Sequence, residues 1–126
     1  MSYVNVLAAG NDHTIWLKGL EFYRDELLIL QKRIQEIASK NSATDVMAGV
    51  EHFQNQFMIQ QKNINDLKHK VRNYIKGIAN DVKIHDGQID EAYLVEAKTL
   101  KVEYEWIEKI MNGLRRELKL FLDKWM

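Results

Sequence analysis

The sequence predicts an all-α protein, an antiparallel bundle of three long helices with coiled-coil-like seams. The first observation is composition, because the 126 residues include no proline and only six glycines, the two residue types that interrupt helices. The second is spacing, because apolar residues recur in alternating steps of three and four along three stretches of the chain. That spacing keeps one stripe of each helix facing its neighbours. At this length we expect a single helical-bundle domain over residues 1–126.

The first helix is predicted at about residues 12–38, after a lead-in arm at 1–11. Its apolar series is Trp16, Leu20, Tyr23, Leu27, Leu30, Ile34 and Ile37. A second series on another face repeats every seven residues, at Ile15, Phe22 and Ile29. A helix that is apolar on more than one stripe normally touches more than one neighbour.

The second helix is predicted at about residues 44–80, after a polar connector at 39–43. Its series is Val46, Val50, Phe53, Phe57, Gln60, Ile64, Leu67, Val71, Tyr74 and Ile78, in which only Gln60 is polar. No glycine or proline lies between Gly49 and Gly77, so we expect one continuous helix. Asn63, Asn65 and Asp66 favour helix weakly. A break near residues 62–66 would instead give a four-helix up-down bundle.

The third helix is predicted at about residues 89–125, after a second connector. Asp86-Gly87 in this connector suits a left-handed turn. The apolar series of this helix is Tyr93, Ala97, Leu100, Tyr104, Ile107, Met111, Leu114, Leu118, Phe121 and Trp125.

The predicted lengths leave one end of the bundle uncovered. At about 1.5 Å per residue the first helix is roughly 40 Å long and the other two roughly 55 Å. Either residues 1–11 or a second subunit must cover the far end, which also holds Ile84, and we expect a homodimer. The predicted interaction surface is Tyr74, Ile75, Ile78, Val82, Ile89, Tyr93 and Leu94.

Composition argues against several classes of function. The 18 basic and 18 acidic residues cancel, so no overall field favours nucleic acid or an anionic membrane. Cysteine is absent, which removes disulfides and thiolate chemistry. No signal peptide and no apolar run of about 20 residues is present, so we expect a cytoplasmic location.

Catalytic motifs are equally sparse. No Gly-x-Ser-x-Gly elbow surrounds Ser2, Ser39 or Ser42, and no glycine-rich loop could hold a phosphate. The chain is therefore predicted not to be an enzyme, with no catalytic residue and no cofactor.

Three histidines suggest an alternative. The segments DHTIWLKGL, HFQNQ at 52–56 and LKHKV resemble the hemerythrin-like family, four-helix bundles that hold a non-haem di-iron centre. The resemblance matches His13, His52 and His69 to family ligands, and Asp123 could lie near the family's aspartate. Gln56 stands where the family has a bridging glutamate and Asn73 where it has a histidine, while the last helix has no histidine. The ligand set is incomplete, so no metal site is favoured, and the alternative is a degenerate hemerythrin-like metal-binding bundle.

The C-terminal segment 114–126, LRRELKLFLDKWM, offers another alternative. It combines basic and apolar residues and could associate with a membrane surface. The function that we expect from the sequence is a non-enzymatic helical-bundle interaction or scaffold protein of unknown partner, which associates with itself.

Overall fold

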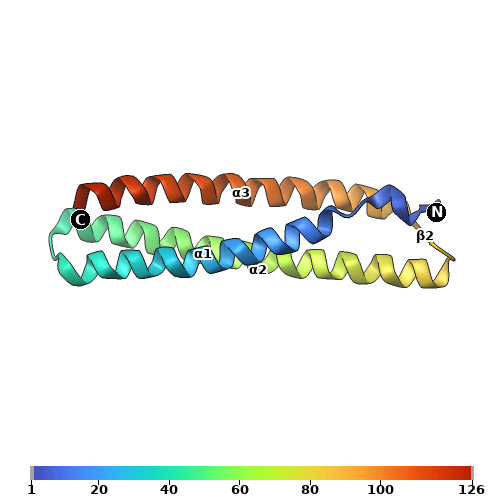
Figure 1. Cartoon of the computed structure of the whole chain (residues 1–126), viewed down its shortest axis with the longest axis horizontal. Helices are drawn as coiled ribbons and strands as arrows, with labels where there is room; N and C mark the ends of the chain where they lie inside the picture. Colours follow the sequence, from blue (N-terminus) through green and yellow to red (C-terminus); the bar gives the residue numbers. More distant parts are fainter. Residues whose placement is uncertain (1, 126) are drawn as a thin grey trace.

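The protein is an all-α helical bundle with a small two-stranded sheet at one end (Figure 1). The structure, a computed structural model, describes residues 2–125. The helices are α1 (Asp12–Lys40), α2 (Thr44–Ile84) and α3 (Ala92–Trp125), and a short 3₁₀ helix, η1, covers Val6–Ala9. The strands β1 (Tyr3–Asn5) and β2 (Gln88–Asp90) pair with each other.

Helix α2 is continuous from Thr44 to Ile84, which confirms the prediction of three long helices within residues 2–125. The alternative break near residues 62–66 does not occur. Ile64 and Leu67 are both buried at this point. Most helical stability in proteins comes from packing of an apolar face, so this burial outweighs the weak helix propensity of the asparagines nearby.

The core consists mainly of the residues that the spacing singled out. In α1 the buried residues are Trp16, Leu20, Tyr23, Leu27, Leu30, Ile34 and Ile37. In α2 the predicted series is buried from Val46 to Tyr74, Gln60 included, and Lys68 is buried as well. In α3 the buried residues are Leu100, Tyr104, Ile107, Met111, Leu114 and Leu118. Tyr93, Ala97, Phe121 and Trp125 are partly buried against this core.

The three helices lie side by side along the long axis of the molecule (Figure 1). The connector between α1 and α2 lies at the same end as the C-terminus, and β2 lies at the other end beside the N-terminus. Helix α1 has 29 residues and α2 has 41. The additional turns of α2 therefore extend past the start of α1, toward the sheet.

Residues 2–9 cover this end, rather than forming the loose arm predicted for 1–11. Strand β1 pairs antiparallel with β2, with Val4 opposite Ile89. The Val6 N–H donates to the Gly87 carbonyl at 3.1 Å, and the Glu91 N–H donates to the Ser2 carbonyl at 3.0 Å. The sequence left two ways of covering this end, by the N-terminal residues or by a second subunit, and the N-terminal residues of the same chain cover it. Met1 lies outside the described residues.

Helix α3 begins at Ala92, a few residues after the predicted start at about 89, because residues 88–90 form β2 instead. Asp86 and Gly87 adopt positive φ angles of 56° and 88°, which turn the chain out of α2. Ile89 then faces inward in β2 with none of its surface exposed. The Asp90 carboxylate accepts a hydrogen bond from the Ala92 N–H at 2.9 Å and thereby caps α3.

Candidate interaction surface

Helix α1 presents a line of large apolar side chains to solvent. Ile15, Phe22 and Ile29 are 63%, 59% and 59% exposed. They lie seven residues apart and therefore on one stripe of the helix. Helix α1 contacts both α2 and α3, as a helix apolar on more than one stripe was expected to do, but this stripe remains exposed.

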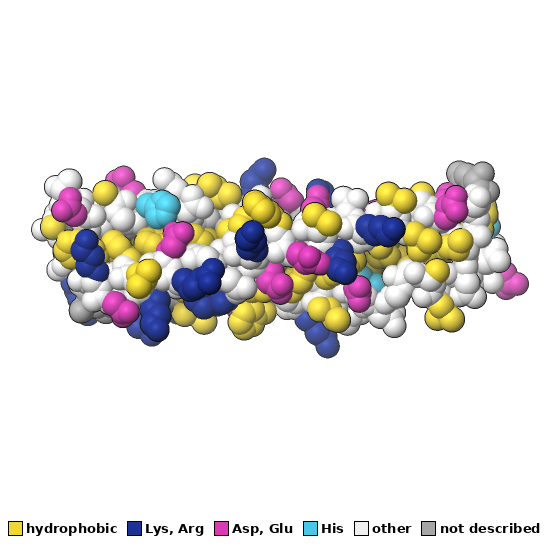
Figure 2. Space-filling model, turned by 90° about the horizontal axis from the view of Figure 1, so that it is seen from above, with side chains coloured by type: hydrophobic (Ala, Val, Ile, Leu, Met, Phe, Trp, Pro, Cys, Tyr) yellow, Lys and Arg dark blue, Asp and Glu magenta, His cyan; other side chains and the backbone are white. Residues whose placement is uncertain are grey.

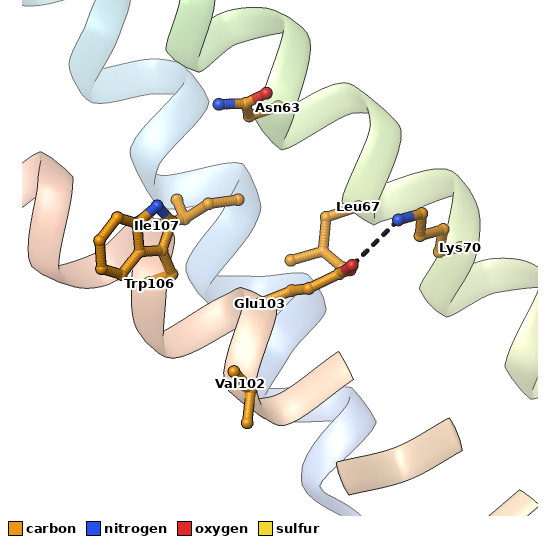
Figure 3. A pocket seen from close by; sticks show the side chains of 7 residues that line it. All are labelled: Asn63, Leu67, Lys70, Val102, Glu103, Trp106 and Ile107. Carbon is orange, nitrogen blue, oxygen red and sulfur yellow. Dashed lines mark hydrogen bonds and ion pairs between the residues drawn. The ribbon is translucent and has the colours of Figure 1, made fainter. Parts of the chain in front are cut away.

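A groove between α2 and α3 forms a second apolar feature (Figure 3). Its pocket of about 350 Å³ is lined by Asn63, Leu67 and Lys70 of α2 and by Val102, Glu103, Trp106 and Ile107 of α3. Lys70 Nζ lies 3.0 Å from Glu103 Oε1 across the pocket (Figure 3). The Trp106 ring is 61% exposed and Val102 is 67% exposed.

A second hollow, of about 470 Å³, continues this groove toward the C-terminal end of α3. Trp106 lines both hollows, and the second also contains Ile110, Gly113 and an ion pair of 3.6 Å between His52 Nε2 and Glu117 Oε2. Figure 2 shows hydrophobic side chains interspersed with charged ones along the length of the molecule. The groove thus has the apolar Trp106 between two ion pairs, Lys70–Glu103 and His52–Glu117. An apolar centre with a polar rim is common in protein-binding surfaces.

Sequence reasoning missed Trp106 and Val102 as surface residues. The available signal was the pair Val95 and Val102, which are seven residues apart and off the main apolar series of α3. Both valines are 67% exposed.

The surface predicted at the end of the bundle is largely occupied by the chain itself. Tyr74 is 2% exposed and Ile89 is fully buried, so these two cannot supply contacts to a partner and the prediction is corrected for them. The other predicted members, Ile75, Ile78, Val82, Tyr93 and Leu94, are partly buried. Burial, with a smaller contribution from Glu96, raises the pKa of Tyr74 above its usual value.

The structure does not bring the candidate metal ligands together. Because α2 is continuous, His52 and His69 lie about 25 Å apart along it. His13, in the first turn of α1, has its ring 6.3 Å from that of Tyr74. Residues 2–125 contain no cluster of three side chains that could hold a metal ion. His52 and His69 therefore cannot coordinate one ion within a single chain.

The C-terminal segment packs its apolar residues onto the bundle. Leu114 and Leu118 are 4% and 2% exposed, while Phe121, Leu122 and Trp125 pack against the core. Met126 lies outside the described residues. Membrane association through this segment would require it to leave the core. Among the helices that the structure describes, none combines the length and apolar character needed to cross a membrane.

A search of protein-family models, of curated proteins and of solved structures found no match to this chain.

Proposed function

We propose that this protein is a non-enzymatic interaction or scaffold module, a cytoplasmic helical bundle that associates with itself as a homodimer. The observation that carries the proposal is the line of exposed apolar side chains on α1, at Ile15, Phe22 and Ile29. These residues lie off the main apolar series of α1, and the core of the bundle does not bury them. Three large apolar side chains aligned on one stripe are more than a single scattered residue, and exposed apolar surface of this kind favours contact with another molecule.

The proposed architecture is an antiparallel bundle with coiled-coil-like seams. The buried residues of each helix follow one another in steps of three and four, which supports seams of this kind. The connectors at opposite ends of the molecule support the antiparallel order (Figure 1).

Charge and pockets support an interaction role over catalysis. Formal net charge is zero, so long-range repulsion between copies is weak. The groove at Trp106 is apolar, and its charged groups, Lys70 and Glu103, already neutralise each other. A surface with this composition suits protein contacts better than proton transfer or nucleophilic attack.

Sedimentation velocity over a wide range of protein concentration tests the proposal. We expect the weight-average mass to rise from one chain toward two as concentration increases. A single species of monomer mass at every concentration, up to the high micromolar range that weak dimers require, would contradict self-association.

A further inference from the structure

We propose that a second copy of this chain docks on α1, with the two α1 helices antiparallel and related by a two-fold axis at Phe22. This inference rests on the proposed self-association and identifies its surface. The line of Ile15, Phe22 and Ile29, together with the charged residues that flank it, is called the α1 face below.

The apolar line is symmetric about Phe22. Ile15 precedes Phe22 by seven residues and Ile29 follows it by seven. In an antiparallel pair centred on Phe22, each Ile15 therefore meets Ile29 of the second copy, and the two phenylalanines meet on the axis. All three side chains are more than half exposed in the single chain. The three side chains can therefore meet the same face of a second copy without rearrangement of the bundle.

The flanking charges are complementary under the same symmetry. In an antiparallel helix pair, each flank of one helix faces the same flank of the other. A residue that precedes the two-fold axis by a given number of positions therefore faces the residue that follows the axis by about the same number. Lys18 lies four residues before Phe22 and Asp25 three residues after it, and both are on one flank of the line. Each Lys18 therefore faces Asp25 of the second copy. Asp12 lies ten residues before Phe22 and Arg33 eleven residues after it, on the other flank. Each Asp12 therefore faces Arg33 of the second copy.

These four side chains are available for such contacts. Asp12, Lys18, Asp25 and Arg33 are all exposed. Within residues 2–125, Asp25 has an ion pair only with the adjacent Arg24, at 3.5 Å between two exposed groups, and the other three have none. Two distinct pairs, each repeated by symmetry, would connect the copies.

The charges also disfavour the parallel alternative. A parallel pair sets one flank against the other at the same level, which places Asp25 beside Glu26 of the second copy and Lys32 beside Arg33. Arg115 of the same chain already neutralises Glu26, with 2.7 Å between Arg115 Nε and Glu26 Oε2, so the repulsion comes from Lys32 and Arg33, which are both exposed. This contact between like charges favours the antiparallel orientation.

The groove at Trp106 does not fit a second copy equally well. An antiparallel pair of α3 helices centred on Trp106 would place Glu96 opposite Glu117, both exposed acids. The α1 face thus meets the requirement of charge complementarity that the α3 surface does not.

Charge reversal and its repair test the inference by sedimentation velocity. We expect Asp25→Lys to weaken the dimer by about tenfold or more, because Lys18 then faces a lysine. The double variant Lys18→Asp/Asp25→Lys restores opposite charges across the axis and should recover most of the affinity. Phe22→Gln should also weaken the dimer. Leu28→Gln should not, because Leu28 is comparably exposed, at 51% against 59% for Phe22, but lies on the same helix off the line.

Single cysteines test the orientation, because the chain contains no native cysteine. Phe22→Cys should form a disulfide-linked dimer on mild oxidation at a protein concentration high enough to offset the weakening caused by loss of the ring, since only the axis brings a residue within about 7 Å of its own copy. Ile15→Cys or Ile29→Cys alone should not, but a mixture of the two should form a mixed dimer. A parallel pair would link each of these variants to itself and would overturn the proposed orientation.

The outcomes separate this inference from the proposed function. A dimer that is unchanged by Asp25→Lys and by Phe22→Gln overturns the α1 face while self-association stands. A wild-type protein that remains monomeric overturns both. Circular dichroism of each variant checks that the bundle is intact, and because the substituted side chains are exposed, we expect unchanged helix content.

Discussion

At the scale of single residues, Gln60 is the polar group that fits its surroundings least well. Its side chain is 3% exposed, and its Oε1 has no hydrogen-bond partner among residues 2–125. A buried acceptor left unsatisfied costs about 1–3 kcal/mol. We therefore expect Gln60→Leu to raise the free energy of unfolding by about that amount, measured by urea denaturation. Gln61→Leu, at the exposed neighbouring position, is the control and should leave stability nearly unchanged. A loss of stability in Gln60→Leu would show that the amide has a structural role.

Tyr23 makes the bundle sensitive to alkaline pH. Burial is the largest cause that raises its pKa above the usual 10.0, followed by the charges of Tyr104 and Glu108. A folded-state pKa above the unfolded value means that the stabilisation is complete below pH 10 and is lost as pH rises beyond it. Tyr74, Tyr93 and Tyr104 have pKa values shifted in the same direction, so their effects add.

We expect the helical circular dichroism signal to fall as the pH is raised above 10, together with the appearance of tyrosinate absorbance. Tyr23→Phe should reduce this loss, because one of the groups that must ionise is gone, although it also removes the 3.3 Å hydrogen bond to Glu108. An identical alkaline transition in wild type and Tyr23→Phe would contradict the assignment to Tyr23.

At the scale of elements, α1 and α3 approach closely where glycine meets an aromatic ring. A methyl group added at Gly19 would overlap the Tyr104 hydroxyl and ring. We expect Gly19→Ala to destabilise the bundle by about 1–3 kcal/mol despite the better helix propensity of alanine. Tyr104→Phe in the same chain should relieve part of this cost, because it removes the overlapping hydroxyl.

Gly113 provides the matched comparison within α3. No atom lies within 4 Å of a Cβ built at this position, so only helix propensity changes on substitution. Gly113→Ala should therefore stabilise the protein by about 0.5–1 kcal/mol in thermal or urea unfolding. Opposite signs at the two glycines would support close packing as the cause, whereas two stabilising substitutions would contradict it.

The helices could be predicted from the sequence, but the sheet could not. Burial along α1 depends on spacing within one helix, so Trp16 through Ile37 could be identified from local periodicity. The pairing of Val4 with Ile89 joins short segments that are distant in the chain, and three-residue strands carry almost no alternation of their own. Ile89 was consequently assigned to the start of a helix and to an interaction surface. Likewise, periodicity identified the stripe at Phe22 but could not tell whether α2, α3 or another molecule covers it.

At the scale of the whole molecule, the proposed docking of a second copy on the α1 face predicts that stability depends on protein concentration. A partner that binds only the folded chain stabilises it by mass action, so the melting temperature should rise with protein concentration. Self-association of this kind meets little electrostatic opposition because the chain carries 18 basic and 18 acidic residues. Differential scanning calorimetry over about a 100-fold concentration range measures the effect, provided that unfolding is reversible.

Variants of the α1 face determine whether that concentration dependence arises there. Phe22→Gln should melt at a temperature nearly independent of concentration and close to that of dilute wild-type protein, because its side chain is exposed and contributes little to the single bundle. Leu28→Gln should retain the wild-type slope, since Leu28 is 51% exposed but lies off the line. Equal slopes in all three proteins would mean that the copies meet through another surface, of which the groove at Trp106 is the next to test. A flat wild-type curve would mean that the exposed stripe of α1 is not covered by a second copy at these concentrations.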